Sequence, residues 1–332
     1  MADMKISIII PVYNTEDCVE KCIRSCMSQT VADMEIIAVD DGSTDSTPSI
    51  LDRLVGEDER IRVLHQANAG SSAARNAGIR ISTGDYLGFV DADDYIEPDM
   101  YEKLIRMAED RHLDVVQISR DEVAGDGSPL PMVVTPPETP TIVSSEDFLK
   151  ELLLHRGDCS FCTKLIRREL FDISLFPEGE LNEDFRLFTE LLSHIDGAGI
   201  LPDIGYHVYY RQGSNTRKAR TEFSRVFKDI VVNADRMEKL VEEKYPNLTE
   251  YARRFALVQR LDYMLHIPVK LMNDHDEFYR NVKAYLREHR QDISGNPYLN
   301  DDQRKKLKLL AYAPRLVRQI HGMTMKLRGV YQ

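Results

Sequence analysis

The strongest constraint in the sequence is a short apolar run that ends abruptly in acidic residues. The run Tyr86-Leu87-Gly88-Phe89-Val90 leads directly into Asp91-Ala92-Asp93-Asp94. A short continuous apolar run predicts a buried strand of a parallel sheet, and ligands of open α/β sheets bind beyond the carboxyl ends of such strands. An Asp-x-Asp pair offers carboxylate oxygens that suit Mg²⁺ or Mn²⁺ shared with substrate phosphates. We therefore interpret Asp91 and Asp93 as the centre of a metal–diphosphate site.

Taken alone, acids after a strand also fit a solvated turn or a helix N-cap. Asp94, which is followed by Glu97-Pro98-Asp99, fits the cap of the next helix. An isolated Asp-x-Asp recurs by chance in many sequences, so the interpretation depends on the motifs that accompany it.

Composition narrows the class of protein. The chain has 332 residues, enough for one large domain or two ordinary ones, and its 42% apolar content is enough for a substantial core. A formal net charge of −12 argues against a general nucleic-acid binder. No stretch approaches ~20 uninterrupted apolar residues, so we expect no membrane span. The N-terminus leads directly into a predicted strand, so we expect no secretory signal.

The five cysteines do not form a disulfide pattern. Cys18, Cys22 and Cys26 recur every fourth residue in a predicted helix, where they fit an apolar face. Cys159 and Cys162 form a single C-x-x-C without the further ligands that a structural zinc site requires. We therefore expect reduced thiols and a cytoplasmic protein.

The first 118 residues alternate between predicted strands and helices. The expected strands cover 5–10, 35–39, 61–64, 86–90 and 114–118, and the expected helices cover 16–28, a segment from about 45, 71–81 and 99–110. This alternation predicts a mostly parallel sheet, covered on both faces by helices through right-handed crossovers. The loops after the strands then meet at one edge. They carry Tyr13, Asp41, Arg75, Asp91 and Asp93.

The rest of the chain divides into a mixed segment and an all-helical one. We expect a loop over 129–140, a helix over 144–155, a helix opened by Leu181-Asn182-Glu183-Asp184-Phe185 and a strand over 206–211. From Thr221 only helical periodicity is found, with helices expected over 221–245, 248–266 and 277–289 and two more after Asn300. We therefore expect two domains, 1–220 and 221–332.

The last thirty residues are basic. The segment 303–332 has eight Lys or Arg and no acid, so the preceding 302 residues carry a net charge of −20, since −20 + 8 = −12. Apolar residues interleave with these bases. The pattern fits a basic amphipathic helix on an anionic bilayer. It fits equally a helix that docks on the acidic body of its own chain.

Five motifs together resemble the family 2 glycosyltransferases of the GT-A fold. In order, they are Ser7-Ile8-Ile9-Ile10-Pro11-Val12-Tyr13-Asn14, Ser28-Gln29-Thr30, Val39-Asp40-Asp41-Gly42-Ser43-Thr44-Asp45, Ala74-Arg75-Asn76-Ala77-Gly78 and Phe89-Val90-Asp91-Ala92-Asp93-Asp94. Their order and spacing match over residues 5–110. The resemblance implies an α/β, Rossmann-like GT-A domain with a mostly parallel sheet flanked by helices, followed here by an all-helical C-terminal extension.

The resemblance also implies roles for particular residues. Pro11, Tyr13 and Asp41 would line the base pocket, where Asp41 would accept a hydrogen bond from uracil. Arg75 would contact the nucleotide, and Ala92 belongs to the same nucleotide-sugar-binding segment. Asp91 would lie near the ribose and the metal, and Asp93 would bind the metal, Mn²⁺ or Mg²⁺. Asp184 matches the catalytic base and Glu183 is its neighbour. The Cys162-Thr163-Lys164-Leu165 stretch has Cys where many members have Trp, which leaves the acceptor contacts there open.

The implied reaction is an inverting transfer of a sugar from a nucleoside diphosphate, usually UDP, to an acceptor hydroxyl. A divalent ion stabilises the departing diphosphate, and Arg211 would add a second cation by gripping phosphate. A carboxylate on the opposite face takes the acceptor proton. For Asp184 the alternative is a helix N-terminal acid stabilised by the helix dipole. From the basic tail we hypothesise a lipid-linked saccharide acceptor in capsule or cell-surface polysaccharide synthesis, at the inner face of the plasma membrane.

Two other functions are consistent with parts of the sequence. A non-catalytic subunit that binds nucleotide sugars would keep the same motifs, and turnover would distinguish it. A haloacid-dehalogenase-like phosphatase also places Asp-x-Asp after a strand, but it needs Thr or Val where this chain has Tyr95, and it uses the first strand rather than the fourth. A dehydrogenase would need G-x-G-x-x-G after the first strand, which Pro11-Val12-Tyr13-Asn14 lacks.

Overall fold

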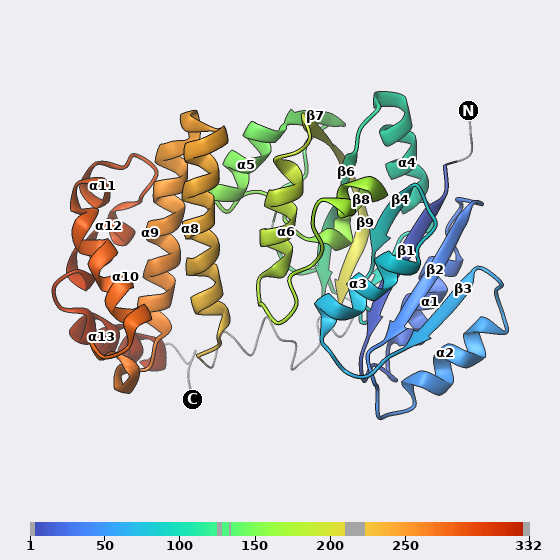
Figure 1. Ribbon diagram of the computed structural model, residues 1–332, viewed down its shortest axis with the longest axis horizontal. Helices are drawn as coiled ribbons and strands as arrows, with labels where there is room; N and C mark the ends of the chain where they lie inside the picture. Colours follow the sequence, from blue (N-terminus) through green and yellow to red (C-terminus); the bar gives the residue numbers. More distant parts are fainter. Residues whose placement is uncertain (1–3, 125–127, 133, 210–222, 328–332) are drawn as a thin grey trace. The chain divides into compact units, whose positions relative to one another are not determined.

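The computed structural model describes residues 4–124, 128–132, 134–209 and 223–327, which belong to two compact units. The sheet unit comprises 1–149, 157–179 and 183–211, and the helical unit comprises 150–156, 180–182 and 212–332. Figure 1 shows the sheet with its helices in blue to yellow and the helical bundle in orange to red. The predicted domain boundary at 220–221 lies outside the described residues.

The first half of the sheet is parallel, as predicted. Strands β1 (Ile6–Val12), β2 (Met34–Asp40), β3 (Ile61–His65) and β4 (Tyr86–Phe89) lie in the order β3-β2-β1-β4. Every residue of β2 and β4 is buried, as are all of β1 except Pro11. Burial on both faces explains why these strands read as continuous apolar runs rather than as alternating ones. The carboxyl ends of β1, β2 and β4 therefore lie side by side.

The second half of the sheet is mixed. Strand β8 (Lys164–Arg167) pairs antiparallel with β4 and with β6 (Val115–Val123), and β6 pairs parallel with β9 (Gly197–Tyr209). Two short strands, β5 (Tyr95–Ile96) and β7 (Thr141–Ser144), pair antiparallel with β9. Sequence periodicity did not predict β5, β7 or β8, since runs of two to four residues carry no legible period.

Among the described residues, six helices belong wholly or, for α5, in part to the sheet unit. They are α1 (Val19–Met27), α2 (Thr47–Val55), α3 (Ser71–Ile81), α4 (Met100–Arg111), α5 (Ser145–Leu153) and α6 (Glu183–Leu192), with 3-10 turns η1 (Phe161–Thr163) and η2 (Arg168–Asp172). The bounds of α3 match the prediction. The predicted start of α1 at Glu16 is three residues early. The Asn14 side chain, in the loop before α1, accepts a hydrogen bond from the Thr44 amide at 2.8 Å, which joins the loops after β1 and β2.

Helix α3 packs closely against β1 because of a glycine. A Cβ built on Gly78 would lie 2.5 Å from Cγ2 of Ile9, so any side chain there would push the helix away from the strand. Residue 78 belongs to the same motif as Arg75 and Asn76. The motif therefore sets the depth at which α3 lies on the sheet.

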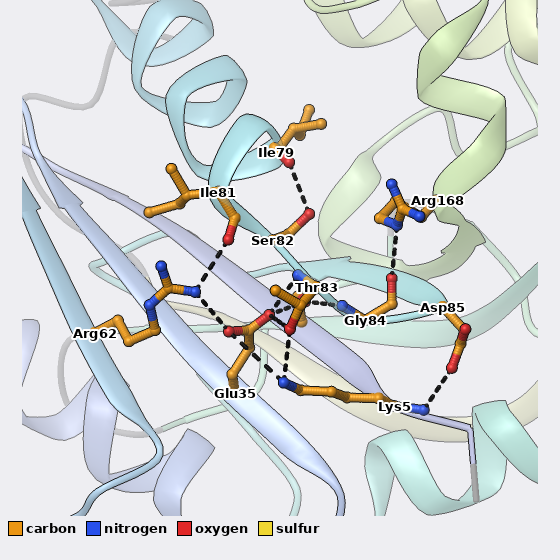
Figure 2. A network of polar contacts seen from close by, with 11 residues as sticks. Lys5, Glu35, Arg62, Ile79, Ile81, Ser82, Thr83, Gly84, Asp85 and Arg168 are labelled. Atoms are coloured by element: carbon orange, nitrogen blue, oxygen red, sulfur yellow. Dashed lines mark hydrogen bonds and ion pairs between the residues drawn. The ribbon is translucent and has the colours of Figure 1, made fainter.

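At the amino ends of the strands, opposite the end that carries the motif residues, a buried acid forms a network (Figure 2). Glu35 of β2 accepts hydrogen bonds from the Ser7 hydroxyl at 2.6 Å, the Thr83 amide at 2.7 Å and Arg62 at 2.9 Å. Burial alone would raise the pKa of Glu35, but these bonds outweigh it and lower the pKa to about 2. The network ties β1, β2, β3 and the end of α3 together.

We expect E35Q to destabilise the fold without altering the site. A carboxyl whose pKa is depressed in the folded state stabilises that state above its unfolded pKa of about 4.5, and the contribution is lost as the pH falls toward 2. We therefore expect E35Q to lower the free energy of unfolding at pH 7 by roughly 2 to 3 kcal/mol. Urea unfolding at pH 7 and at pH 3 measures this. A wild-type stability advantage that does not shrink at the lower pH would contradict the assignment.

The helical unit is a bundle with its own core. It contains α8 (Val226–Lys244), α9 (Thr249–His266), α10 (Glu277–Glu288), α11 (Arg290–Gly295), α12 (Asp301–Leu310) and α13 (Pro314–Leu327), with 3-10 turns η3 (Pro246–Leu248) and η4 (Val269–Leu271). Leu257, Met264, Leu286 and Leu307 are fully buried there. The helices predicted from 221 onward are confirmed within the described residues, and α11 was not predicted. Within those residues, no helix combines the length and the apolar character that crossing a bilayer requires.

Candidate active site

The site lies at the carboxyl ends of β1, β2 and β4, where the sequence predicted it. Tyr13 follows β1 and is 50% exposed, so its ring is open to a ligand. Asp41 follows β2 and is buried, and Asp91 lies beyond β4 with 40% of its side chain exposed. Glu183 and Asp184 begin α6, far along the chain, and the fold brings them to the same place.

Asp41 organises the loop between β3 and α3. Its Oδ1 accepts hydrogen bonds from Gln66 Nε2 at 2.7 Å and from the Ala69 amide at 2.9 Å, and its Oδ2 accepts from the Gly70 amide at 2.8 Å. Gly70 has φ +94°, a conformation that favours glycine. A carboxylate has about four acceptor positions. Three are used within the chain, so the predicted contact of Asp41 with a base would use the remaining one.

Arg75 is the centre of the site. Its guanidinium is buried and donates to Asp91 Oδ1 at 2.9 Å and to Glu183 Oε1 at 3.1 Å, while Asp184 Oδ1 lies 3.8 Å away. Burial opposes the charge of Arg75, but the carboxylates of Asp91, Asp184 and Glu183 outweigh burial, so its pKa is raised above the ordinary value. One cation therefore holds the acids beyond β4 and the acids of α6 together.

The next residue of the same motif fixes the loop beneath Arg75. Asn76 donates to the Phe176 carbonyl at 2.9 Å and accepts from the Phe176 amide at 2.9 Å. The Phe176 ring lies 5.2 Å from the Arg75 guanidinium carbon, a cation–π contact. Arg75 therefore binds the acidic residues, and Asn76 fixes the backbone of Phe176, whose ring contacts Arg75.

Asp184 has the electrostatics of a proton acceptor. Burial raises its pKa most, Arg75 and Lys164 oppose the rise, and the nearby charges of Glu183 and Asp91 add to it, which gives a pKa of about 7. The side chain as a whole is 24% exposed, but its Oδ1 is sealed from solvent and accepts no hydrogen bond among the described residues. A carboxylate with a pKa near neutrality suits general base catalysis.

Asp94 is a buried structural acid and does not cap a helix. The N-cap position of α4 is Asp99, and Asp94 instead accepts from the Tyr206 hydroxyl at 2.6 Å and from the Tyr209 amide at 2.8 Å. The Tyr206 hydroxyl also accepts from the Asp91 amide at 3.1 Å. These bonds tie the acidic turn to β9. The prediction of a cap was wrong because the partners come from a strand more than a hundred residues away.

The burial of Asp94 separates it chemically from its neighbours. Burial and the charges of Asp91 and Asp93 raise the pKa of Asp94 well above its usual range. Of the three acids in the turn, Asp91 and Asp93 therefore remain the candidates for carrying negative charge toward a ligand.

Comparisons with known proteins identify the family to which the chain belongs. A family model described as "Glycosyl transferase family 2" matches residues 7–173, from β1 through η2, which is half of the chain. The chain belongs to glycosyl transferase family 2. The resemblance drawn from the five motifs is thereby confirmed.

Curated relatives match half of the chain or less. An uncharacterized glycosyltransferase EpsJ from Bacillus subtilis is 40% identical over 171 residues, which cover 50% of this chain and 49% of the relative. An uncharacterized glycosyltransferase YibD from Escherichia coli is 48% identical over 117 residues, which cover 35% of this chain and 34% of the relative. The match therefore spans half or less of the length of these relatives.

Solved structures match over nearly the whole chain. The Staphylococcus aureus TarS 1–349 structure in complex with UDP-GlcNAc superposes with a TM-score of 0.75 at 20% identity, covering 97% of this chain and 92% of that one. A mannosyltransferase from Pyrobaculum calidifontis, in complex with GDP-Man and Mn²⁺, gives a TM-score of 0.56 at 15% identity over 96% of this chain and 87% of that one. At these identities the likeness shows the fold, and the predicted GT-A fold is confirmed.

The donor set beyond β4 fits a metal that is completed by its substrate. The described residues contain no cluster of three or more His, Cys, Asp or Glu that could hold a metal alone. Mg²⁺ is commonly held by one or two carboxylates together with substrate phosphates and water. Asp91 and Asp93 provide such a pair, although Asp91 is also engaged by Arg75. The roles predicted for them remain predictions.

Three other predicted features have different outcomes. Arg211 lies outside the described residues. Cys162 is buried, and burial raises the pKa of its thiol well above the usual range, so it is a neutral group beneath the site. Lys164 is fully buried and donates to the carbonyls of Asp158 at 2.8 Å and Ser160 at 2.6 Å. All four residues of the Cys162–Leu165 stretch are thus buried.

Proposed function

We propose that this protein is an inverting glycosyltransferase that moves a sugar from a UDP donor to an acceptor hydroxyl. One observation supports this best: Arg75 holds Asp91, beyond the end of β4, on the same guanidinium as Glu183 and beside Asp184, at the start of α6. The carboxylate proposed for the donor side, Asp91, and those proposed for the acceptor side, Glu183 and Asp184, are thereby held around one guanidinium. Such fixed positions are what group transfer between two bound substrates requires.

Asp184 is the base in this proposal. With a pKa of about 7 it is deprotonated in much of the population at neutral pH, yet basic enough to accept the proton of an acceptor hydroxyl. The acceptor oxygen, as it loses its proton to Asp184, would attack from the face opposite the leaving diphosphate and so invert the sugar carbon. Glu183 accepts a hydrogen bond from Arg75 and holds that guanidinium in place.

The donor would lie over the carboxyl ends of β1 and β2. The exposed Tyr13 ring offers a stacking surface for the base, Pro11 lies beside it, and Asp41 has acceptor capacity left for a base N–H. The TarS neighbour, solved with UDP-GlcNAc, supports a uridine donor. Mn²⁺ or Mg²⁺, when bound by Asp91 and Asp93, would neutralise charge on the diphosphate, a use supported by the Mn²⁺ complex of the mannosyltransferase neighbour.

The acceptor and the compartment are further parts of this proposal. We propose a saccharide or lipid-linked saccharide acceptor, in the synthesis of a cell-surface polysaccharide on the cytoplasmic side of the membrane. All five cysteines are free thiols, which is consistent with a reducing compartment.

A donor screen tests the proposal. UDP-, GDP- and dTDP-sugars are compared by thermal shift with and without Mn²⁺, and UDP release is then measured with the donor that binds. We expect a UDP-sugar to raise the melting temperature, more with Mn²⁺ than without, and UDP release to follow. Binding without turnover in the presence of acceptor would favour the non-catalytic subunit, and phosphate release from a monoester would favour the phosphatase.

A further inference from the structure

The outward face of α13 is an exposed apolar stripe. Leu316, Ile320, Met323 and Leu327 are 58%, 55%, 66% and 89% exposed. Their spacing of four, three and four residues places them in one line along the helix. Tyr312 is 65% exposed and directly precedes the helix. Among the described residues, no other helix carries so continuous a row of exposed apolar side chains.

The opposite face of α13 docks on its own helical unit. Val317 packs against the core of that unit, Arg315 donates to the Met272 carbonyl at 2.6 Å, and Arg318 donates to the Ile267 carbonyl at 2.9 Å. The alternative in which this basic helix docks on its own chain therefore accounts for this face. It does not account for the stripe, whose side chains are exposed on the opposite face.

The segment that carries the stripe is basic. The sequence has eight Lys or Arg and no acid from 303 to 332. Lys305 and Lys308 lie on α12, which contacts α13, and both are exposed. The apolar row and the bases together are complementary to a lipid bilayer, which has an apolar interior and anionic headgroups.

We propose that the α13 stripe, Leu316, Ile320, Met323 and Leu327, is a peripheral contact with an anionic lipid bilayer. A second copy of the chain fits less well, because a symmetric contact would bring the same bases face to face. The helix lies in the bilayer interface with its apolar side chains among the acyl chains, and Lys305 and Lys308 of the neighbouring α12 reach the phosphates. This inference goes beyond the transferase reaction and does not depend on it.

Vesicle binding of the full-length protein tests the contact without donor or acceptor. Phosphatidylcholine vesicles with and without phosphatidylglycerol are sedimented with the wild type, with L316Q/I320Q/M323Q and with a matched control, V55Q/V232Q/I173Q. The control changes three residues that are 39%, 40% and 43% exposed elsewhere. We expect the wild type and the control to bind only the anionic vesicles and to be released by salt. We expect binding by the stripe variant to fall at least about tenfold.

Several outcomes would overturn the inference. Wild-type protein that stays in the supernatant with anionic vesicles would overturn it. A loss of vesicle binding in the control variant equal to that in the stripe variant would also overturn it. A concentration-dependent dimer that the stripe variant abolishes, without any vesicle binding, would assign the stripe to a second copy. Melting temperatures and donor hydrolysis without lipid, both expected to be unchanged in the stripe variant, verify that it is folded. Since binding is measured without donor, its failure is distinct from failure of the transferase proposal.

Discussion

D184N is expected to lower kcat for sugar transfer by about 10² to 10⁴ while leaving donor binding nearly unchanged. The amide has the shape of the carboxylate but cannot accept a proton, and general base catalysis contributes about that factor. Asp184 lies at the start of α6, and its Oδ1 accepts no hydrogen bond among the described residues, so the substitution breaks no hydrogen bond at that oxygen. UDP release with acceptor present measures kcat, and the thermal shift caused by UDP measures binding.

The matched control for D184N is E190Q on the same helix. Glu190 is half-buried and lies between one and two turns further along α6. We expect E190Q to turn over as the wild type does. Undiminished turnover in D184N would mean that another group accepts the proton, and loss of the UDP thermal shift would mean that Asp184 binds the donor instead.

R75M is expected to have the second largest effect, on both activity and stability. The substitution leaves Asp91, Glu183 and Asp184 without the cation that they share, and removal of one partner from a buried charge pair costs about 3 to 5 kcal/mol. The pKa of Asp184 should also rise further, because Arg75 is the strongest influence that lowers it. We expect a melting temperature several degrees lower and little turnover at pH 7. R75K should recover part of the stability only, since an ammonium does not reach three carboxylates as a guanidinium does.

The control for R75M is R80M on the same helix. Arg80 is 58% exposed and approaches Glu178 only at 3.9 Å, so its loss should change stability by less than about 0.5 kcal/mol. If R75M and R80M unfold at the same temperature, Arg75 does not hold the site together. If R75M keeps wild-type turnover at pH 7, the proposed tuning of Asp184 by Arg75 is wrong.

The sequence allowed the parallel half of the sheet to be predicted, and with it the sheet edge at which the candidate residues lie, because both depend on local pattern. The runs Ile8–Ile10, Ile36–Val39 and Tyr86–Phe89 are apolar and lead into polar motifs, so the strands and the edge at which ligands bind were predicted together. The helix over 71–81 was predicted to the residue. The antiparallel strand Lys164–Arg167 was not, because its four residues have charged ends and gain their place only by pairing with β4 and β6.

Long-range partners were the part of the site that sequence did not provide. Arg75 was expected to meet the nucleotide, and the structure adds its bonds to Asp91 and Glu183, residues 16 and 108 positions away. Asp94 was expected to cap a helix, and its partners are Tyr206 and Tyr209. The one available signal for Asp94 was composition: three acids in four residues cannot all face one ligand, so one of them is expected to be buried and paired.

The measurement that tests the central claim most directly is the pH dependence of kcat for UDP release, in the wild type and in E183Q. If Asp184 is the base with a pKa of about 7, wild-type kcat rises tenfold per pH unit below that value and levels off above it. The charge of Glu183 raises the pKa of Asp184, so E183Q should move the rise to lower pH. A wild-type profile that is flat from pH 5 to 8, or one that E183Q leaves in place, would contradict the assignment of Asp184 as the base.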